Sequence, residues 1–153
     1  MVFGRDVRCI GAGQRRHVFG YVEQKFCSVP GSVRDQITLY EDELPEEAVR
    51  RAAGLAGLDE ILASLEQGYD TPFSEKLFSQ GQLQLLAIAR AVVCDPDILL
   101  LDEMTANLDS DTEAQVMKAL QAAGERRTVI SISHRLSEGL KGRRICLESG
   151  IKG

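Results

Sequence analysis

The longest regular pattern of apolar residues lies in the middle of the chain. Apolar side chains recur there at helical spacing, at Leu85, Leu86, Ile88, Ala89, Val92 and Val93. Ser79-Gln80-Gly81-Gln82 has the S-x-x-Q form of a capping box, which predicts that the helix begins at Ser79. Cys94-Asp95-Pro96 ends it, because proline cannot continue the backbone hydrogen bonding. Four consecutive apolar residues, Ile98 to Leu101, then predict a strand buried on both faces.

Two adjacent carboxylates, Asp102 and Glu103, follow this strand directly. In open parallel sheets, ligands bind outside the carboxyl ends of the strands. One acid there can hold Mg²⁺, and a second can orient or deprotonate an attacking water. The helix that begins at Ser79 offers free N–H groups to a phosphate. Taken alone, each piece is as consistent with an ordinary strand end or helix cap as with a site.

The amino-terminal part predicts short elements. Val7 to Ile10 and Val18 to Val22 read as strands, and Gln24 follows the second strand. The Gly11-Ala12-Gly13 run is predicted as a turn, because it lacks the third glycine and the following helix of a dinucleotide fingerprint. His17 is expected at the surface or at an edge of the sheet.

Residues 41–68 are more polar and predict two short helices. Acidic side chains surround Pro45, which suits the first position of a helix. Helical patterns cover 46–56 and 58–66, with Gly57 as the break between them. We interpret the acidic run as a solvated face.

Past the paired carboxylates, the pattern predicts a further helix and strand. Ser110-Asp111-Thr112-Glu113 is a second capping box, opening a helix to about Ala123, and Thr128 to Ser133 reads as a strand. Strand, helix and strand form a βαβ unit with parallel strands. This geometry places His134 at the same sheet edge as the two carboxylates. Arg143 to Leu147 predicts one last strand.

Composition narrows the class of protein. The chain has 153 residues, room for about one domain, and its net charge of −5 argues against nucleic acid as a partner. No run of apolar residues approaches the roughly 18 that suggest a transmembrane helix, and the first residues lack a signal-peptide core. The cysteines Cys9, Cys27, Cys94 and Cys146 show no metal-ligand spacing in sequence and read as reduced thiols.

Several motifs together resemble those of ATP-binding-cassette (ABC) ATPases. Residues 78–82, FSQGQ, resemble the signature motif, residues 97–103, DILLLDE, resemble the Walker B segment, and Asn107-Leu108-Asp109 is similar to the D-loop. Phe78 replaces the usual leucine of the signature, and Gln80 replaces its first glycine.

Further segments fit the same resemblance. Residues 21–26, YVEQKF, resemble the Q-loop, and 30–37, PGSVRDQI, are similar to the segment that follows it in exporter-type members. Residues 131–137, SISHRLS, resemble the switch segment. Glu75 matches an acid that the family associates with coupling to the membrane domains.

The resemblance implies an α/β fold, part of the P-loop NTPase type, with a mostly parallel sheet and a small helical subdomain. Residues 1–26 and 85–153 would form the α/β core, and residues 27–84 the helical subdomain that carries the signature.

The resemblance also implies ATP and Mg²⁺ as cofactors and assigns roles at the sheet edge. Asp102 would hold Mg²⁺ through water, and Gln24 would sense both the metal and the attacking water. Glu103 would polarise that water, and His134 would stabilise the γ-phosphate.

A second group of residues would act across a dimer. In the family, Ser79, Gly81 and Gln82 correspond to residues that cap the γ-phosphate of an ATP held by the opposite subunit, with Asp109 helping. The implied partner is therefore a second nucleotide-binding domain, arranged head to tail.

One part of the family pattern is not in this sequence. No Gly-Lys dipeptide occurs, so the phosphate cradle G-x-x-x-x-G-K-[ST] is absent. In the family this motif lies upstream of the segments found here. We therefore expect an incomplete domain, inactive alone, with unpaired strand edges that favour self-association.

The sequence thus predicts the ATP-hydrolysing subunit, or a fragment of it, of an exporter-like ABC transporter. Such a subunit would be cytoplasmic and held at the inner face of the cell membrane by transmembrane partner domains. The alternatives are a soluble ABC-type ATPase of another class, a non-catalytic module that presents a signature surface, and a truncated inactive product. The transported substrate is set by membrane domains that this sequence does not contain.

Overall fold

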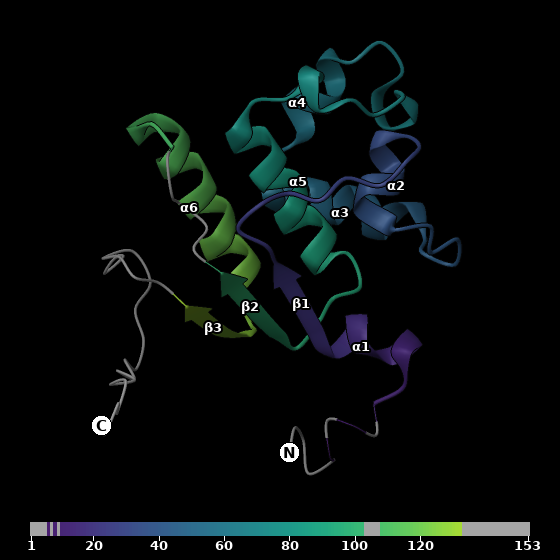
Figure 1. Ribbon diagram of the computed structural model, residues 1–153, viewed down its shortest axis with the longest axis vertical. Coiled ribbons are helices and arrows are strands. Elements are labelled where there is room, and N and C mark those ends of the chain that lie inside the picture. Colours follow the sequence, from purple (N-terminus) through teal and green to yellow (C-terminus); the bar gives the residue numbers. More distant parts are fainter. Residues whose placement is uncertain (1–5, 7, 9, 103–107, 133–153) are drawn as a thin grey trace, which may run out of the picture.

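The computed structural model describes residues 6, 8, 10–102 and 108–132. These residues form a three-stranded sheet with a layer of helices above it, and a short helix beside the amino end of the first strand (Figure 1). The elements in chain order are α1 (Ala12–Val18), β1 (Phe19–Val22), α2 (Val33–Thr38), α3 (Glu46–Ala56), α4 (Asp59–Ser64), η2 (Gly68–Asp70), η3 (Glu75–Leu77), α5 (Gln80–Val92), β2 (Ile98–Asp102), α6 (Ser110–Gly124) and β3 (Thr128–Ile132). The predicted α/β class is confirmed.

The sheet is parallel throughout, with the strand order β1-β2-β3. Val22 is level with Leu101, and Asp102 is level with Ile132. The segment β2–α6–β3 is the predicted βαβ unit. Because the strands are parallel and in this register, all three carboxyl ends lie at one edge of the sheet.

Strand β2 is buried on one face and not on both as predicted. Leu99 and Leu101 are buried in the core shared with the helices, whereas Ile98 and Leu100 are half-buried. The reason is that the helical core lies against the Leu99 side only, within the part of the chain that the structure describes.

Strand β3 ends the sheet on one side and carries exposed apolar side chains. Ile130 and Ile132 are 50% and 63% exposed. An edge strand of this kind offers backbone groups and apolar surface to another chain. The predicted self-association stays a prediction.

Helix α5 begins as its sequence predicts. Ser79 is the N-cap, and its side chain and that of Gln82 form both bonds of a capping box. Leu86, Ile88 and Ala89 are fully buried in the core. The helix ends at Val92, before a turn in which Asp95 adopts a left-handed conformation (φ 50°).

The two short predicted helices are also confirmed, to within one or two residues, as α3 and α4. Gly57 ends α3 in the left-handed conformation (φ 74°), which glycine adopts without steric cost. Pro45 is the N-cap of α3 and not its first residue. Glu46, at the start of α3, is exposed and pairs with Arg34 and Arg50.

The turn predicted at Gly11-Ala12-Gly13 is wrong, since helix α1 begins at Ala12 and runs to Val18. Its polar residues give no amphipathic pattern, and long-range contacts hold it in place. Arg16 donates to the carbonyls of Thr38 (2.6 Å) and Ile37 (3.3 Å) and pairs with Glu41 (2.6 Å). The basic residues of α1 lie in its last turn, where the helix dipole favours positive charge.

The cap of α6 also differs from the prediction. Asp109, and not Ser110, is the N-cap, because Asp109 Oδ1 accepts a hydrogen bond from the backbone N–H of Thr112 at 3.0 Å. Aspartate and serine are about equally favoured at this position, so the sequence alone could not choose between these neighbours.

Two further predicted strands fall partly or wholly outside the described residues. In the first, Val7 and Cys9 lie outside the described residues, Arg8 is in a helical turn and Ile10 in a bend. The second, Arg143 to Leu147, lies wholly outside them.

Helix α5 packs on β1 at a distance that only glycine permits. A Cβ atom at Gly20 would lie 2.4 Å from the carbonyl oxygen of Ala91 and 2.7 Å from Leu99 Cδ2. The first of these neighbours is backbone, so it cannot move aside without shifting the helix.

We therefore expect Gly20→Ala to lower the free energy of unfolding by about 1–3 kcal/mol, as overpacking does. Urea unfolding followed by circular dichroism measures the change. Gly13→Ala is the matched control, because a Cβ at Gly13 meets no atom within 4 Å. Within helix α1 that substitution should stabilise by up to about 1 kcal/mol. Equal urea midpoints for Gly20→Ala and Gly13→Ala would contradict the close packing of α5 on β1.

Candidate functional site

The carboxyl edge of the sheet brings two of the predicted site residues to the same side of the molecule. Asp102 is the last residue of β2 and is half-buried. Gln24 lies two residues beyond the end of β1, in an exposed bend. Since Val22 and Leu101 are paired in the parallel register, both residues follow strands that end at the same level.

Tyr21 is a residue of this edge that the sequence did not single out. Its hydroxyl donates to Asp102 Oδ2 at 3.2 Å. Partial burial, the hydrogen bond to Asp102 and the charges of Asp102 and Glu23 all raise the pKa of Tyr21, so the phenol stays a neutral donor. Tyr21 pairs with Leu100 on the neighbouring strand. Asp102 is two residues beyond Leu100, and side chains two apart in a strand share a face, so Tyr21 and Asp102 lie on the same face of the sheet. Only the register, once known, reveals this contact.

Two predicted catalytic residues, Glu103 and His134, lie outside the described residues. The strands that lead to them end at Asp102 and Ile132, which are paired across β2 and β3. Their roles stay predictions.

The signature residues form the start of α5. Ser79 Oγ accepts from the backbone N–H of Gln82 at 3.2 Å, and Gln82 Oε1 accepts from the backbone N–H of Ser79 at 2.8 Å. These bonds hold the first turn in a fixed shape. Gln80 is exposed, so its long side chain does not displace the core.

Gly81 lies where α5 meets α6. A Cβ atom there would lie 2.1 Å from Thr112 Cγ2, so glycine is needed for the two helices to approach. Thr112 also bonds to Asp109, and this hydrogen bonding lowers the pKa of Asp109. The starts of α5 and α6 therefore form one unit that contains four of the predicted residues, Ser79, Gly81, Gln82 and Asp109.

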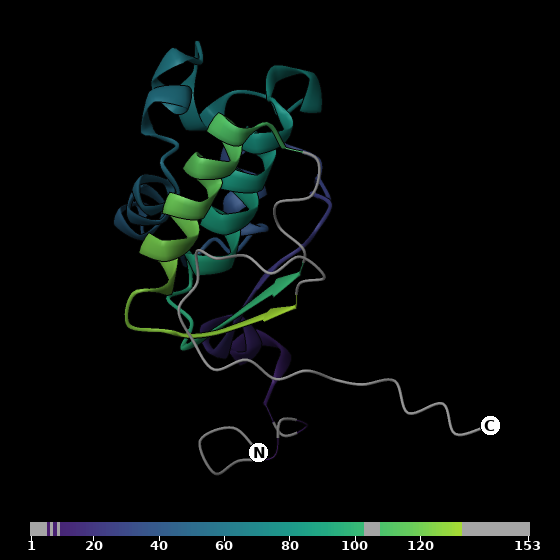
Figure 2. The ribbon, with the colours of Figure 1, turned by 90° about the vertical axis from the view of Figure 1, so that its left-hand side faces the viewer.

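A cavity of about 760 Å³ opens beside this unit, between α3, α5 and α6. Ser79, Gly81, Gln82 and Thr112 line one part of it, but Asp102 and Gln24 do not line it. Figures 1 and 2 both place the start of α6 away from the arrowhead of β2. The described part of the chain thus divides the predicted site residues into two separate groups.

Arg90 connects the segment after Gln24 to α5. Its guanidinium donates to the carbonyls of Gln36 (2.6 Å) and Cys27 (2.8 Å) and lies over the ring of Phe26, 4.3 Å from its centroid. Burial lowers the pKa of Arg90, which remains far above neutrality because arginine is always charged in proteins. No local sequence pattern marks Arg90, because its partners are distant in the chain.

No helix of the described residues has the length and apolar character needed to cross a membrane.

Comparison with known proteins agrees with the motifs. The chain matches the family described as "ABC transporter" over residues 2–106. It is 42% identical over 134 residues to "Putative ABC transporter ATP-binding protein exp8" of Streptococcus pneumoniae serotype 4. This alignment covers 86% of this chain and 23% of that protein. It is 43% identical over 136 residues to "P-glycoprotein 14" of Caenorhabditis elegans. This alignment covers 88% of this chain and 10% of that protein.

A solved structure shows the same likeness. The structure described as "Structure of a bacterial Atm1-family ABC exporter with ATP bound" superposes with a TM-score of 0.71 at 36% sequence identity. The match covers 88% of this chain and 24% of the exporter chain. The chain thus spans less than a quarter of the length of each of these relatives. The family match and these identities show that the chain belongs to the ABC transporter family.

Proposed function

We propose that this chain is part of the ATP-hydrolysing domain of an exporter-type ABC transporter. The observation that carries the proposal is the division of the site residues into two groups, one at the sheet edge and one at the starts of α5 and α6. A nucleotide that needs both groups has to lie between two domains. The names of the relatives, which include an ABC exporter and a P-glycoprotein, support the transporter class.

The sheet edge has donors that fit Mg²⁺. Asp102 supplies carboxylate oxygens and Gln24 an amide oxygen, and Mg²⁺ prefers oxygen ligands while keeping several waters. Bound Mg²⁺ would neutralise charge that develops on the phosphates. Tyr21 donates to one oxygen of Asp102 and so fixes the orientation of this carboxylate. We propose that Glu103 polarises the attacking water and that His134 stabilises the γ-phosphate.

The start of α5 fits a phosphate. Helix N-termini bind anions through free N–H groups and the positive end of the dipole. We propose that Ser79, Gly81 and Gln82 cap the γ-phosphate of an ATP held by the opposite domain. Asp109 lies beside them through Thr112 and would help across the same head-to-tail interface.

The wider assembly is part of the same proposal. Residues 27–84 would form the helical subdomain, and 1–26 with 85–153 the α/β core. Transmembrane partner domains would hold the ATPase at the cytoplasmic face of a membrane, with Glu75 near the coupling surface. The helices α2, α3 and α4, which lie between β1 and α5 in the chain, support this division.

A chimera tests the function. A segment that carries the phosphate cradle G-x-x-x-x-G-K-[ST] is joined in frame ahead of this chain, and ATP hydrolysis is measured with and without Mg²⁺. We expect Mg²⁺-dependent turnover by the chimera and none by the chain alone, which has no phosphate cradle in its sequence. Glu103→Gln should lower kcat by about 10²-fold or more, because it removes the group that polarises the water.

Glu66→Gln is the matched control, since Glu66 is exposed and lies in the turn after α4. It should leave turnover unchanged. Full activity of Glu103→Gln, or turnover by the chain alone, would sink the proposed mechanism.

Tyr21 gives a separate prediction in the same chimera. Tyr21→Phe should raise the Mg²⁺ concentration for half-maximal activity by several-fold to about tenfold, because partners that orient a metal ligand have effects of this order. The value of kcat at saturating Mg²⁺ should not change. Tyr69→Phe, in η2, should change neither value. An unaltered Mg²⁺ dependence in Tyr21→Phe would show that the bond to Asp102 does not position the carboxylate for the metal.

A further inference from the structure

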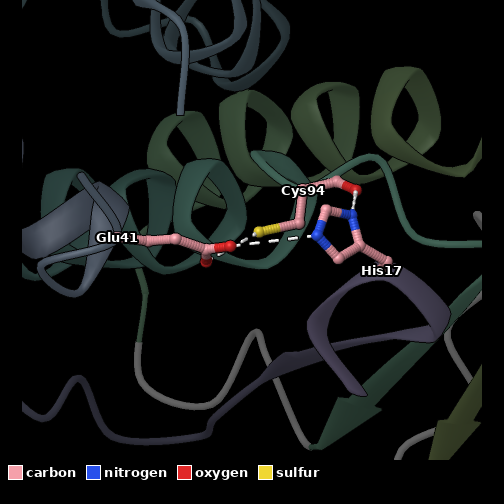
Figure 3. Close-up of side chains that lie close together, drawn as sticks. All are labelled: His17, Glu41 and Cys94. Carbon is pink, nitrogen blue, oxygen red and sulfur yellow. Dashed lines mark hydrogen bonds and ion pairs between the residues drawn. The ribbon is translucent and has the colours of Figure 1, made fainter. Parts of the chain in front are cut away.

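Three residues from different parts of the chain converge at the amino end of the sheet, opposite the edge that carries Asp102. His17 lies in α1 just before β1, Glu41 follows α2, and Cys94 follows α5 just before β2 (Figure 3). Their imidazole nitrogen, carboxylate oxygen and sulfur all lie within 4.8 Å of one another. Cys94 is buried, Glu41 is half-buried and His17 is exposed.

The spacing of these atoms approaches that of a small transition-metal site. His17 Nε2 lies 3.8 Å from Glu41 Oε1, and Cys94 Sγ lies 3.5 Å from Glu41 Oε2. Bonds of about 2.0–2.1 Å to nitrogen and oxygen and about 2.3 Å to sulfur place tetrahedral zinc ligands about 3.3–3.6 Å apart. All three atoms lie within 4.8 Å of one another, so side-chain movements of about 1 Å would bring them into one coordination sphere.

The second nitrogen of His17 supports this arrangement. Nδ1 lies 3.0 Å from the backbone carbonyl oxygen of Cys94. A carbonyl only accepts, so Nδ1 carries the proton, and in the neutral ring Nε2 keeps its lone pair. That lone pair is on the side of Glu41. A histidine that donates one ring N–H to a carbonyl and offers the other nitrogen is typical of metal ligands.

Arg16 is the positive group beside the cluster. It donates to Glu41 Oε2 at 2.6 Å and also to the carbonyl of Thr38, so it is fixed on one side of the carboxylate. The other oxygen, Oε1, is the one nearest His17. The Glu41 carboxylate and the Cys94 thiolate would balance the two positive charges of a divalent ion. With the charge of Arg16 added, the net charge of the occupied site would be only +1.

The thiol of Cys94 sets the condition for binding. Burial, as the largest cause, raises the pKa of Cys94 to about 11. The thiol donates to Glu41 Oε2 at 3.5 Å. A bound ion has to displace this proton, as metal binding to cysteine generally does.

We propose that His17, Glu41 and Cys94 form a site for a zinc-type divalent cation, with water completing the coordination. One sulfur, one nitrogen and one oxygen suit Zn²⁺ or Co²⁺, whereas Mg²⁺ and Ca²⁺ prefer oxygen alone. The ion would link α1, the segment after α2 and the end of α5. Because the site lies at the opposite end of the strands from Asp102, it is separate from the proposed ATP site.

Cobalt binding tests the site, because a thiolate bound to Co²⁺ gives a sulfur-to-metal charge-transfer band. Co²⁺ is titrated into the full metal-free chain, and Zn²⁺ is then added as competitor. We expect one Co²⁺ per chain, with the charge-transfer band, and its displacement by Zn²⁺. Cys94→Ser should abolish the band, and His17→Gln and Glu41→Gln should each weaken binding by at least tenfold.

Cys27→Ser is the matched control, since Cys27 is an exposed free cysteine that is not a member of the cluster. It should keep both the band and the affinity. His17 is exposed, so His17→Gln is expected to fold, and zinc should raise the melting temperature of the original chain but not of this variant. An unchanged band in Cys94→Ser, unchanged affinity in His17→Gln, or no stoichiometric binding would each overturn the proposal.

Discussion

The close approach of helix α5 to strand β1 is the contact on which the rest of the structure depends. Gly20 lets the backbone of the strand lie against the carbonyl of Ala91, so the helix is fixed on the sheet near its carboxyl end. The other end of the same helix, at Gly81, lies against the side chain of Thr112 in α6. A single helix thereby sets the distance between the sheet and the signature residues, and Arg90 ties the segment after Gln24 to it.

The parallel sheet then separates the chemistry by strand direction. The carboxyl ends gather Asp102, Tyr21 and Gln24, which have oxygen donors suited to Mg²⁺. The amino ends gather His17, Glu41 and Cys94, whose mixed donors suit a different ion. The starts of α5 and α6 form the third group, beside their own cavity. An ATP site that uses both the first and the third group requires a second domain.

Much of the fold is readable from the sequence where signals are local. Three such signals act within a few residues: the capping box at Ser79, Pro96 and Gly57. The structure confirms the helices whose ends they mark. Helix α1 was missed because Arg16 is held by carbonyls more than twenty residues away. The cap of α6 was misplaced by one residue because Asp109 and Ser110 have similar capping preferences.

The candidate site, too, is readable from the sequence only in part. The resemblance implied that Asp102 and Gln24 act at one edge, and both residues follow strands that end at the same level. The contact between Tyr21 and Asp102 depends on strand register, which no local pattern gives. The cluster at the amino end depends on the fold still more, since His17 and Cys94 are 77 residues apart in sequence.

The central claim is that one chain provides two separated halves of composite sites. Sedimentation velocity of the chimera carrying Glu103→Gln, with and without Mg-ATP, tests it most directly. This substitution should slow hydrolysis, so ATP stays bound and a nucleotide held between two domains should link them. The predicted result is a monomer without ATP and a dimer with Mg-ATP, containing one nucleotide per chain. A chimera that binds ATP fully and remains monomeric would contradict the claim.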